Sequence, residues 1–207
     1  PTSKKTELSP IAKAISLAKD MGLDPESPRL AEFRRDTTFK HQFAAYEKKL
    51  RQVGNVDFAD LIGRTIELLE TDRQVLQSVH RRFKMVLVDE YQDSNIAQFN
   101  LLKHLVGPQT FVCVVGDDDQ SIYRFRGAEV ENILSFPDVY PGTKVVKLEQ
   151  NYRSTKAILA VASSVIRNNS GRHEKNLWTD KHGGSIPRLI HVSDERSEAM
   201  QVAPELR

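Results

Sequence analysis

The alternation of short apolar runs with helical segments constrains the fold of this chain most strongly. Runs of aliphatic and β-branched residues occur at 85–88, 111–115 and 144–148, and a further strand candidate lies at 188–192. Helical segments are expected between them, near 95–106, 128–135 and 154–168. Because parallel strands need long crossover connections, this order predicts an α/β fold with a parallel sheet and crossover helices.

The first apolar run ends in two adjacent carboxylates. Residues 85–88 read Met-Val-Leu-Val and are followed by Asp89 and Glu90, as expected where a buried parallel strand enters an acidic loop. One interpretation is that these acids cap the next helix. The other is a site for a hard cation and a water molecule, because ligands collect outside the carboxyl ends of parallel strands.

The second run ends in the same way, which favours a ligand site. Residues 114–120 read Val-Val-Gly-Asp-Asp-Asp-Gln, so an apolar strand again leads into acids at its carboxyl end. Two neighbouring strands that both finish in acids are more specific than one, and oxygen ligands of this kind suit a divalent cation. Solvated loops without a ligand are the alternative.

Two further clusters mix aromatic rings with guanidinium groups. Residues 121–127 read Ser-Ile-Tyr-Arg-Phe-Arg-Gly, which offers flat faces for bases and cations for phosphates; an ordinary turn with an exposed arginine pair is the alternative. Residues 148–154 read Leu-Glu-Gln-Asn-Tyr-Arg-Ser, and Ser154 is expected to cap the following helix. An arginine there can neutralise charge on a transferred phosphoryl group, and a tyrosine can stack on a base.

The first 80 residues are expected to be all-helical. Ser9 and Pro10 predict a cap followed by a first-turn proline, in a helix that Gly22 closes. Another helix should end at Gly54, and its apolar residues recur at helical spacing: Phe39, Phe43, Tyr46 and Leu50. Their aromatic stripe is typical of core packing, with a base-stacking platform as the less favoured interpretation.

A third helix is expected to begin near Asp57. Its inner side is predicted to consist of the apolar and small residues at helical spacing, namely Phe58, Leu61, Ile62, Thr65, Ile66 and Leu69.

Composition limits the kind of protein further. The 207 residues suffice for one ordinary domain or two small ones, and the 39% hydrophobic content supports a core. With 30 Lys and Arg against 28 Asp and Glu, the net charge of +2 excludes a polycation, so any nucleic-acid site is a local patch. Cys113 cannot form an internal disulfide and is expected to be a buried hydrophobe, which favours a cytoplasmic protein. No apolar segment approaches the length of a membrane span.

Taken together, the ordered motifs resemble the UvrD/Rep/PcrA-type superfamily 1 DNA helicases. The resemblance covers nearly all of residues 56–180 and is carried by 56–61, 87–93, 115–128, 148–154 and 175–180. It implies a RecA-like fold of the P-loop NTPase type. It also implies three regions: a helical subdomain at 1–80, part of an inserted 1B-like region; the C-terminal part of the first motor lobe at 81–140; and the start of the second lobe at 141–207.

The resemblance also implies roles for polar residues around ATP and Mg²⁺. Asp89 would hold Mg²⁺, and Glu90 would orient or deprotonate the attacking water. Gln92 would couple the site to its surroundings, and Gln120 would sense the γ-phosphate.

The aromatic and arginine residues receive roles by the same resemblance. Tyr152 would stack on adenine, and Arg153 would act as an arginine finger from the second lobe. Tyr123, Phe125 and Arg126 would lie beside single-stranded DNA. The partners implied are ATP, single-stranded DNA and junctions of single- and double-stranded DNA.

One expected motif does not occur in the chain. A P-loop needs G-x-x-x-x-G-K-[ST], yet none of the ten glycines is followed by lysine. The family places this loop upstream of the helical subdomain, and the chain starts without Met, so we expect an internal fragment of a longer protein.

The function expected is therefore part of an ATP-dependent 3′-to-5′ DNA helicase, with little ATPase activity in this chain alone. The alternatives are a non-hydrolysing module that binds single-stranded nucleic acid, or the motor part of a helicase–nuclease subunit.

Overall fold

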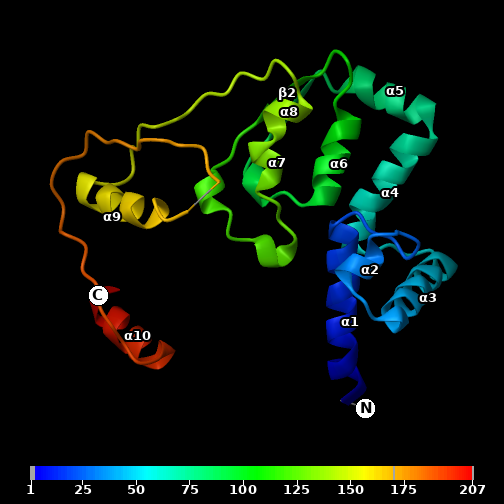
Figure 1. The fold of residues 1–207 in the computed structure, drawn as a ribbon, viewed down its shortest axis with the longest axis horizontal. Helices are drawn as coiled ribbons and strands as arrows, with labels where there is room; N and C mark the ends of the chain where they lie inside the picture. The colour runs from blue at the N-terminus through cyan, green and yellow to red at the C-terminus, as the bar shows by residue number, and fades with distance from the viewer. Residues whose placement is uncertain (1–2, 170, 207) are drawn as a thin grey trace. The chain divides into compact units, whose positions relative to one another are not determined.

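Helices make up the first part of the chain in the computed structural model, which describes residues 3–169 and 171–206. They are coloured blue to teal in Figure 1 and comprise α1 (Ser3–Asp20), α2 (Leu30–Phe33), α3 (Thr37–Val53), α4 (Phe58–Thr71) and α5 (Arg73–Arg82). The chain divides into two compact units, residues 1–145 and 146–207. Each unit is described by itself below.

The helices of the first unit close around an apolar cluster. It consists of buried residues from α1, α2, α3 and the loop after α1: Ile15, Ala18, Leu23, Leu30, Phe39 and Phe43. The rings of Phe39 and Phe43 lie 6.0 Å apart between centroids. The predicted core role of the aromatic stripe is therefore confirmed.

Two predicted helix ends are confirmed and one predicted start is wrong. Gly22 and Gly54 adopt φ angles of +68° and +67°, a conformation that glycine tolerates without a steric penalty. The first helix, however, starts at Ser3 rather than after Ser9, so Pro10 lies inside α1. The helix accommodates this proline at the cost of one backbone hydrogen bond.

The predicted inner side of α4 is only partly correct. The helix begins after Asp57, as expected. Asp57 caps it, because Asp57 accepts a hydrogen bond from the Asp60 amide while the Asp60 carboxylate accepts one from the Asp57 amide. Leu69 is buried, but Phe58 is 92% exposed and Leu61 is 57% exposed. The reason is that α4 turns the Asp60 carboxylate inward, where it pairs with a lysine.

This lysine, Lys19, pairs with a largely buried acidic cluster between α1, α3 and α4. Its Nζ lies 2.7 Å from Glu47 Oε1, 2.8 Å from Asp57 Oδ2 and 2.8 Å from Asp60 Oδ1. Burial disfavours the charged lysine, but hydrogen bonds to the three carboxylates outweigh it and raise the pKa of Lys19 to about 12. Arg64 adds a contact of 2.9 Å to Glu47 Oε2.

The α/β part of the first unit contains a parallel strand pair. β1 (Met85–Val88) lies beside β2 (Phe111–Val114) in a register that pairs Met85 with Phe111 and Val88 with Val114. The crossover between them contains α6 (Ile96–Leu105), as predicted from the sequence. Three short 3₁₀ turns follow the strands: η1 (Tyr91–Asp93), η2 (Asp118–Gln120) and η3 (Arg124–Arg126).

Only one face of this strand pair is covered within the described residues. The four valines at 86, 88, 112 and 114 pack against Tyr91, Leu102 and Phe136, which come from η1, α6 and α8 (Phe136–Val139). Met85, Leu87 and Phe111 point to the other face and are exposed. The expectation of a buried parallel strand at 85–88 is therefore wrong for this face, because the described helices pack on the other side.

Several elements predicted further along the chain do not form. The helix expected near 128–135 is reduced to α7 (Glu131–Leu134). Residues 144–148 and 188–192 are not strands, and the described pairing is a single bridge between Gln150 and Trp178. Within the described residues, neither segment has a neighbouring strand that would pair with its backbone. In the first of them, Val146 and Leu148 are also largely exposed.

The described residues of the second unit form α9 (Lys156–Ile166), α10 (Glu195–Val202) and the 3₁₀ turn η4 (Ala203–Leu206). Across the described part of both units, no helix combines the length and apolar character needed to cross a bilayer.

We predict that Lys19→Met lowers the free energy of unfolding by about 3–5 kcal/mol, because it removes the cation shared by the buried Glu47 and Asp60 and the part-buried Asp57. Urea unfolding of the chain measures the change. Lys40→Met is the matched control, since the ion pair of Lys40 with Glu26 is exposed and worth less than about 1 kcal/mol. Equal effects of the two substitutions would contradict a stabilising role for the buried cluster.

Candidate functional site

Backbone hydrogen bonds join the loops that follow β1 and β2. The Val115 amide donates to the Val88 carbonyl at 2.8 Å, and the Tyr91 amide donates to the Val115 carbonyl at 2.9 Å. These two bonds hold the loops together directly beyond the strands. The acids that end the two strands consequently lie at one edge of the sheet, as ligand-binding residues do in α/β folds.

Asp89 and Glu90 form the exposed tip of the first loop. Glu90 has a φ angle of +50°, which is strained for a residue with a side chain. Its amide donates to the Asp89 carboxylate at 2.9 Å. Neither acid caps α6, since Asn95 performs that role by accepting from the Gln98 amide at 2.8 Å. The helix-cap interpretation of this acid pair is therefore wrong.

The side chain of Gln92 connects the two acidic loops. It is only 1% exposed. Its Nε2 donates to Glu90 Oε2 at 2.8 Å, and its Oε1 accepts from the Asp117 amide at 2.9 Å. One neutral carboxamide thus fixes a carboxylate of the first loop and the backbone of the second.

Gly116 provides the space that this arrangement needs. A Cβ atom at this position would lie 2.5 Å from Gln92 Oε1 and 2.7 Å from the Ile133 side chain. Both distances are shorter than a normal contact, so any larger residue must displace Gln92. The sequence showed this glycine at a strand end without indicating the close approach.

The second loop holds the triplet Asp117, Asp118 and Asp119. Their carboxylates come close enough to share a cation, and among the described residues they form the group of acids that could do so. Asp89 is not a member of this group. The Gln120 carboxamide donates to Asp117 Oδ2 at 2.7 Å, which places Gln120 beside the acids.

Residues 121–127 follow directly and form a loop with exposed rings, called the aromatic loop below. The rings of Tyr123 and Phe125 lie 5.9 Å apart between centroids, and Phe125 is 72% exposed. Gly127 ends the turn with a φ angle of +82°. The backbone of Arg126 belongs to η3, but its side chain lies outside the described part of the structure.

In the second unit, the segment that carries Tyr152 and Arg153 is a polar turn. Asn151 Oδ1 accepts from the amides of Arg153 at 2.9 Å and Ser154 at 2.7 Å. The residue at the N-cap position of α9 is Thr155. The expectation that Ser154 caps this helix is therefore wrong. Both Tyr152 and Arg153 are exposed.

Residues 176–181 hold this turn from the other side. The Asn151 amide donates to the Trp178 carbonyl at 2.7 Å, and Lys181 Nζ donates to the Arg153 carbonyl at 3.2 Å. Tyr152 donates to Gln150 Oε1 at 2.6 Å. Residues 175–180 resemble the family in sequence, but nothing in that sequence indicates this supporting role.

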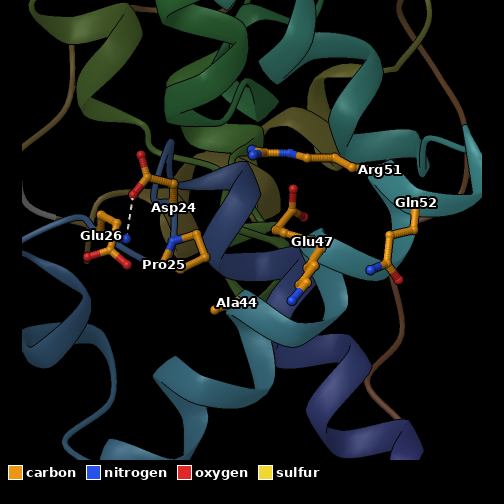
Figure 2. Close-up of a pocket in the computed structure, with 8 residues that line it drawn as sticks. Asp24, Pro25, Glu26, Ala44, Glu47, Arg51 and Gln52 are labelled. Carbon is orange, nitrogen blue, oxygen red and sulfur yellow. Dashed lines mark hydrogen bonds between the residues drawn. The ribbon is translucent and has the colours of Figure 1, made fainter.

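A hollow of about 590 Å³ lies on the helical part of the first unit (Figure 2). It is lined by Asp24, Pro25, Glu26, Ala44, Glu47, Lys48, Arg51 and Gln52. The lining mixes acidic and basic side chains, and it includes none of the residues predicted from the sequence to bind nucleotide or DNA.

We predict that Gly116→Ala destabilises the chain by about 1–3 kcal/mol, because the new methyl group displaces Gln92 and Ile133. Gly63→Ala is the matched control: nothing lies within 4 Å of its added Cβ, and alanine suits the middle of α4. The control should gain about 0.5–1 kcal/mol. Urea unfolding compares the two variants, and a neutral Gly116→Ala would contradict the tight contact.

Comparison with known protein families assigns both parts of the chain. Residues 2–141 match the UvrD/REP helicase N-terminal domain. Residues 146–207 match the UvrD-like helicase C-terminal domain.

Individual relatives agree with this assignment. The chain is 45% identical over 208 residues to ATP-dependent DNA helicase UvrD1 of Mycobacterium bovis, covering 95% of this chain and 27% of the relative. It is 47% identical over 204 residues to ATP-dependent DNA helicase PcrA of Bacillus subtilis, covering 98% and 28%. A probable DNA helicase II homolog of Rickettsia conorii is 40% identical, with 93% and 30% covered.

The chain thus spans less than a third of the length of these relatives. The family match, in contrast, extends over nearly every residue of the chain. This chain belongs to the UvrD/REP helicase family.

Proposed function

We propose that the chain is part of an ATP-dependent DNA helicase that moves 3′-to-5′ on single-stranded DNA and unwinds junctions with duplex DNA. The main support is the hydrogen-bonded link from Glu90 through Gln92 to Asp117, which joins two acidic strand ends next to an aromatic loop. The relatives are named ATP-dependent DNA helicases, which supports the same reaction.

In this proposal, the architecture is RecA-like. Residues 81–140 form the C-terminal part of the first motor lobe, and 141–207 form the start of the second. Residues 1–80 are the helical subdomain of the inserted region. The parallel β1–α6–β2 unit with acids at its carboxyl end supports the first of these assignments.

The acidic loops serve ATP hydrolysis in this proposal. Asp89 holds Mg²⁺, and its exposed carboxylate is a suitable hard-oxygen donor. When bound, Mg²⁺ neutralises charge on the phosphates. Glu90 orients or deprotonates the attacking water, and its bond from Gln92 keeps the carboxylate in one direction. Gln120 senses the γ-phosphate.

The remaining residues contact the base, the phosphate and the DNA. Tyr152 stacks on adenine, and Arg153 stabilises charge on the transferred phosphoryl group. Tyr123, Phe125 and Arg126 lie along single-stranded DNA, where exposed rings stack on bases.

We predict that this chain by itself does not hydrolyse ATP. The isolated chain should not hydrolyse ATP above background, with or without an oligodeoxythymidine, because it lacks the lysine of a P-loop. A phosphate-release assay at saturating Mg²⁺ measures this. Turnover that Glu90→Gln abolishes would refute the claim of inactivity while supporting the role of Glu90.

We also predict that the ring of Phe125 contributes to the binding of single-stranded DNA. Phe125→Ala should weaken binding to a fluorescent oligodeoxythymidine at low salt by about 1–3 kcal/mol, the value of one base–aromatic stack. Phe58→Ala is the matched control, since it removes an exposed ring from α4. Unchanged binding in Phe125→Ala would remove the basis for a DNA contact at this loop.

A non-hydrolysing nucleic-acid-binding module is the second candidate, and the absent Gly-Lys pair favours it for this chain. It shares the DNA prediction but differs for the whole protein. If the longer protein contains no P-loop, and binds single strands in a salt-dependent way without ATP turnover, the module is the correct description.

A further inference from the structure

Two segments of the first unit, residues 94–95 and 128–129, run side by side. Asn95 and Ala128 form an antiparallel bridge. The Glu129 amide donates to the Ser94 carbonyl at 3.0 Å, and the Ser121 hydroxyl donates to the Gln92 carbonyl at 3.3 Å. The aromatic loop is therefore attached at both of its ends to residues 92–95.

Asn132 closes this attachment from below. It lies on α7 and is 8% exposed. Its Nδ2 donates to the Ser94 carbonyl at 3.1 Å and to the Ser94 hydroxyl oxygen at 3.2 Å. The same hydroxyl donates to the Tyr91 carbonyl at 2.7 Å. Ser94 is thus held through its carbonyl and its side chain at once.

The Ser94 carbonyl accepts two hydrogen bonds, one from the Glu129 amide and one from Asn132. A carbonyl oxygen has two lone pairs, so both are used. All of these groups are buried or partly buried, and an unpaired buried donor or acceptor costs free energy. Loss of the Asn132 donor therefore weakens the contact that anchors Glu129 and the loop before it.

We infer that Asn132 is a positioning residue, which fixes the aromatic loop of Tyr123 and Phe125 against the segment that carries Gln92. It contacts neither the proposed nucleotide nor the proposed DNA, and acts through Ser94. The inference rests on the proposed function for its consequence in DNA binding. Its structural claim, an ordered loop that depends on Asn132, stands independently.

The chemistry of the side chain makes the inference testable. Asn132→Asp keeps the shape but replaces the donating amide by a carboxylate that faces two oxygen atoms of Ser94. Asn55→Asp is the matched control, because Asn55 is exposed and makes no side-chain hydrogen bond among the described residues. Ser94→Ala provides a second variant, which removes one of the two acceptors and leaves the backbone intact.

The experiment is hydrogen exchange of the whole chain, followed by mass spectrometry. In Asn132→Asp, amides at 127–129 should exchange about 10-fold faster, while those of α3 keep their rate. Ser94→Ala should give a smaller change in the same region, and Asn55→Asp none. If exchange at 127–129 is unchanged, or rises equally in α3, the positioning role is overturned. Should Asn132→Asp fail to fold, Ser94→Ala decides by the same criteria.

Binding of the fluorescent oligodeoxythymidine separates this inference from the proposed function. If the unaltered chain binds it, Asn132→Asp should weaken binding at least about 3-fold. Unchanged affinity would overturn the consequence for DNA. If the unaltered chain does not bind it, the proposed DNA contact fails, and exchange at 127–129 still decides whether Asn132 orders the loop.

Discussion

A buried carboxamide determines how the two acidic loops lie relative to each other. Gln92 donates to Glu90 and accepts from the Asp117 amide, so it uses both ends of its side chain. A carboxylate in its place has no donor for Glu90, and an apolar residue has neither donor nor acceptor. Because an unpaired polar group costs about 1–3 kcal/mol when buried, separating the two loops at Gln92 is unfavourable. The absence of a side chain at Gly116 is the condition for this contact.

The helical part of the first unit solves a different problem, since it buries charge rather than a neutral amide. Lys19 holds three carboxylates at the end of α1, and the neighbouring Asp20 is hydrogen-bonded by Asn95. The pKa of Asp20 is raised overall, because burial and the charge of Asp57 outweigh the opposite effect of the bond from Asn95. The end of α1 therefore contacts the residue that also pairs with Ala128. Helical packing and the aromatic loop thus meet at Asn95.

The sequence predicted local features that depend on neighbouring residues. The α3 stripe of Phe39 and Phe43, the start of α4 near Asp57 and the parallel pairing of residues 85–88 with 111–114 follow from periodicity and chain order. It failed where the partner is distant in the chain. Phe58 suits a buried helix face, but the ion pair of Asp60 with Lys19 decides which face of α4 is inside.

The same limit applies to the candidate site. The acids and rings could be found from strand ends and composition, because those signals are local. Gly116 and Asn132 could not, since each acts on a residue 24 or 38 positions away that nothing in the sequence identifies as its partner. A strand predicted at 144–148 fails for a related reason: its own residues are suitable, but a strand also needs a neighbour.

The aromatic loop illustrates how exposed rings can be held in place. Phe125 is largely exposed, so burial of its ring contributes little to the order of the loop. The segments on either side hold the loop, because the Ser121 hydroxyl and the backbone of Ala128 and Glu129 are bonded to residues 92–95. Polar anchoring leaves the ring faces accessible, whereas anchoring by apolar burial would hide them. A surface that stacks on nucleobases needs exposed rings on a loop that polar contacts hold in place.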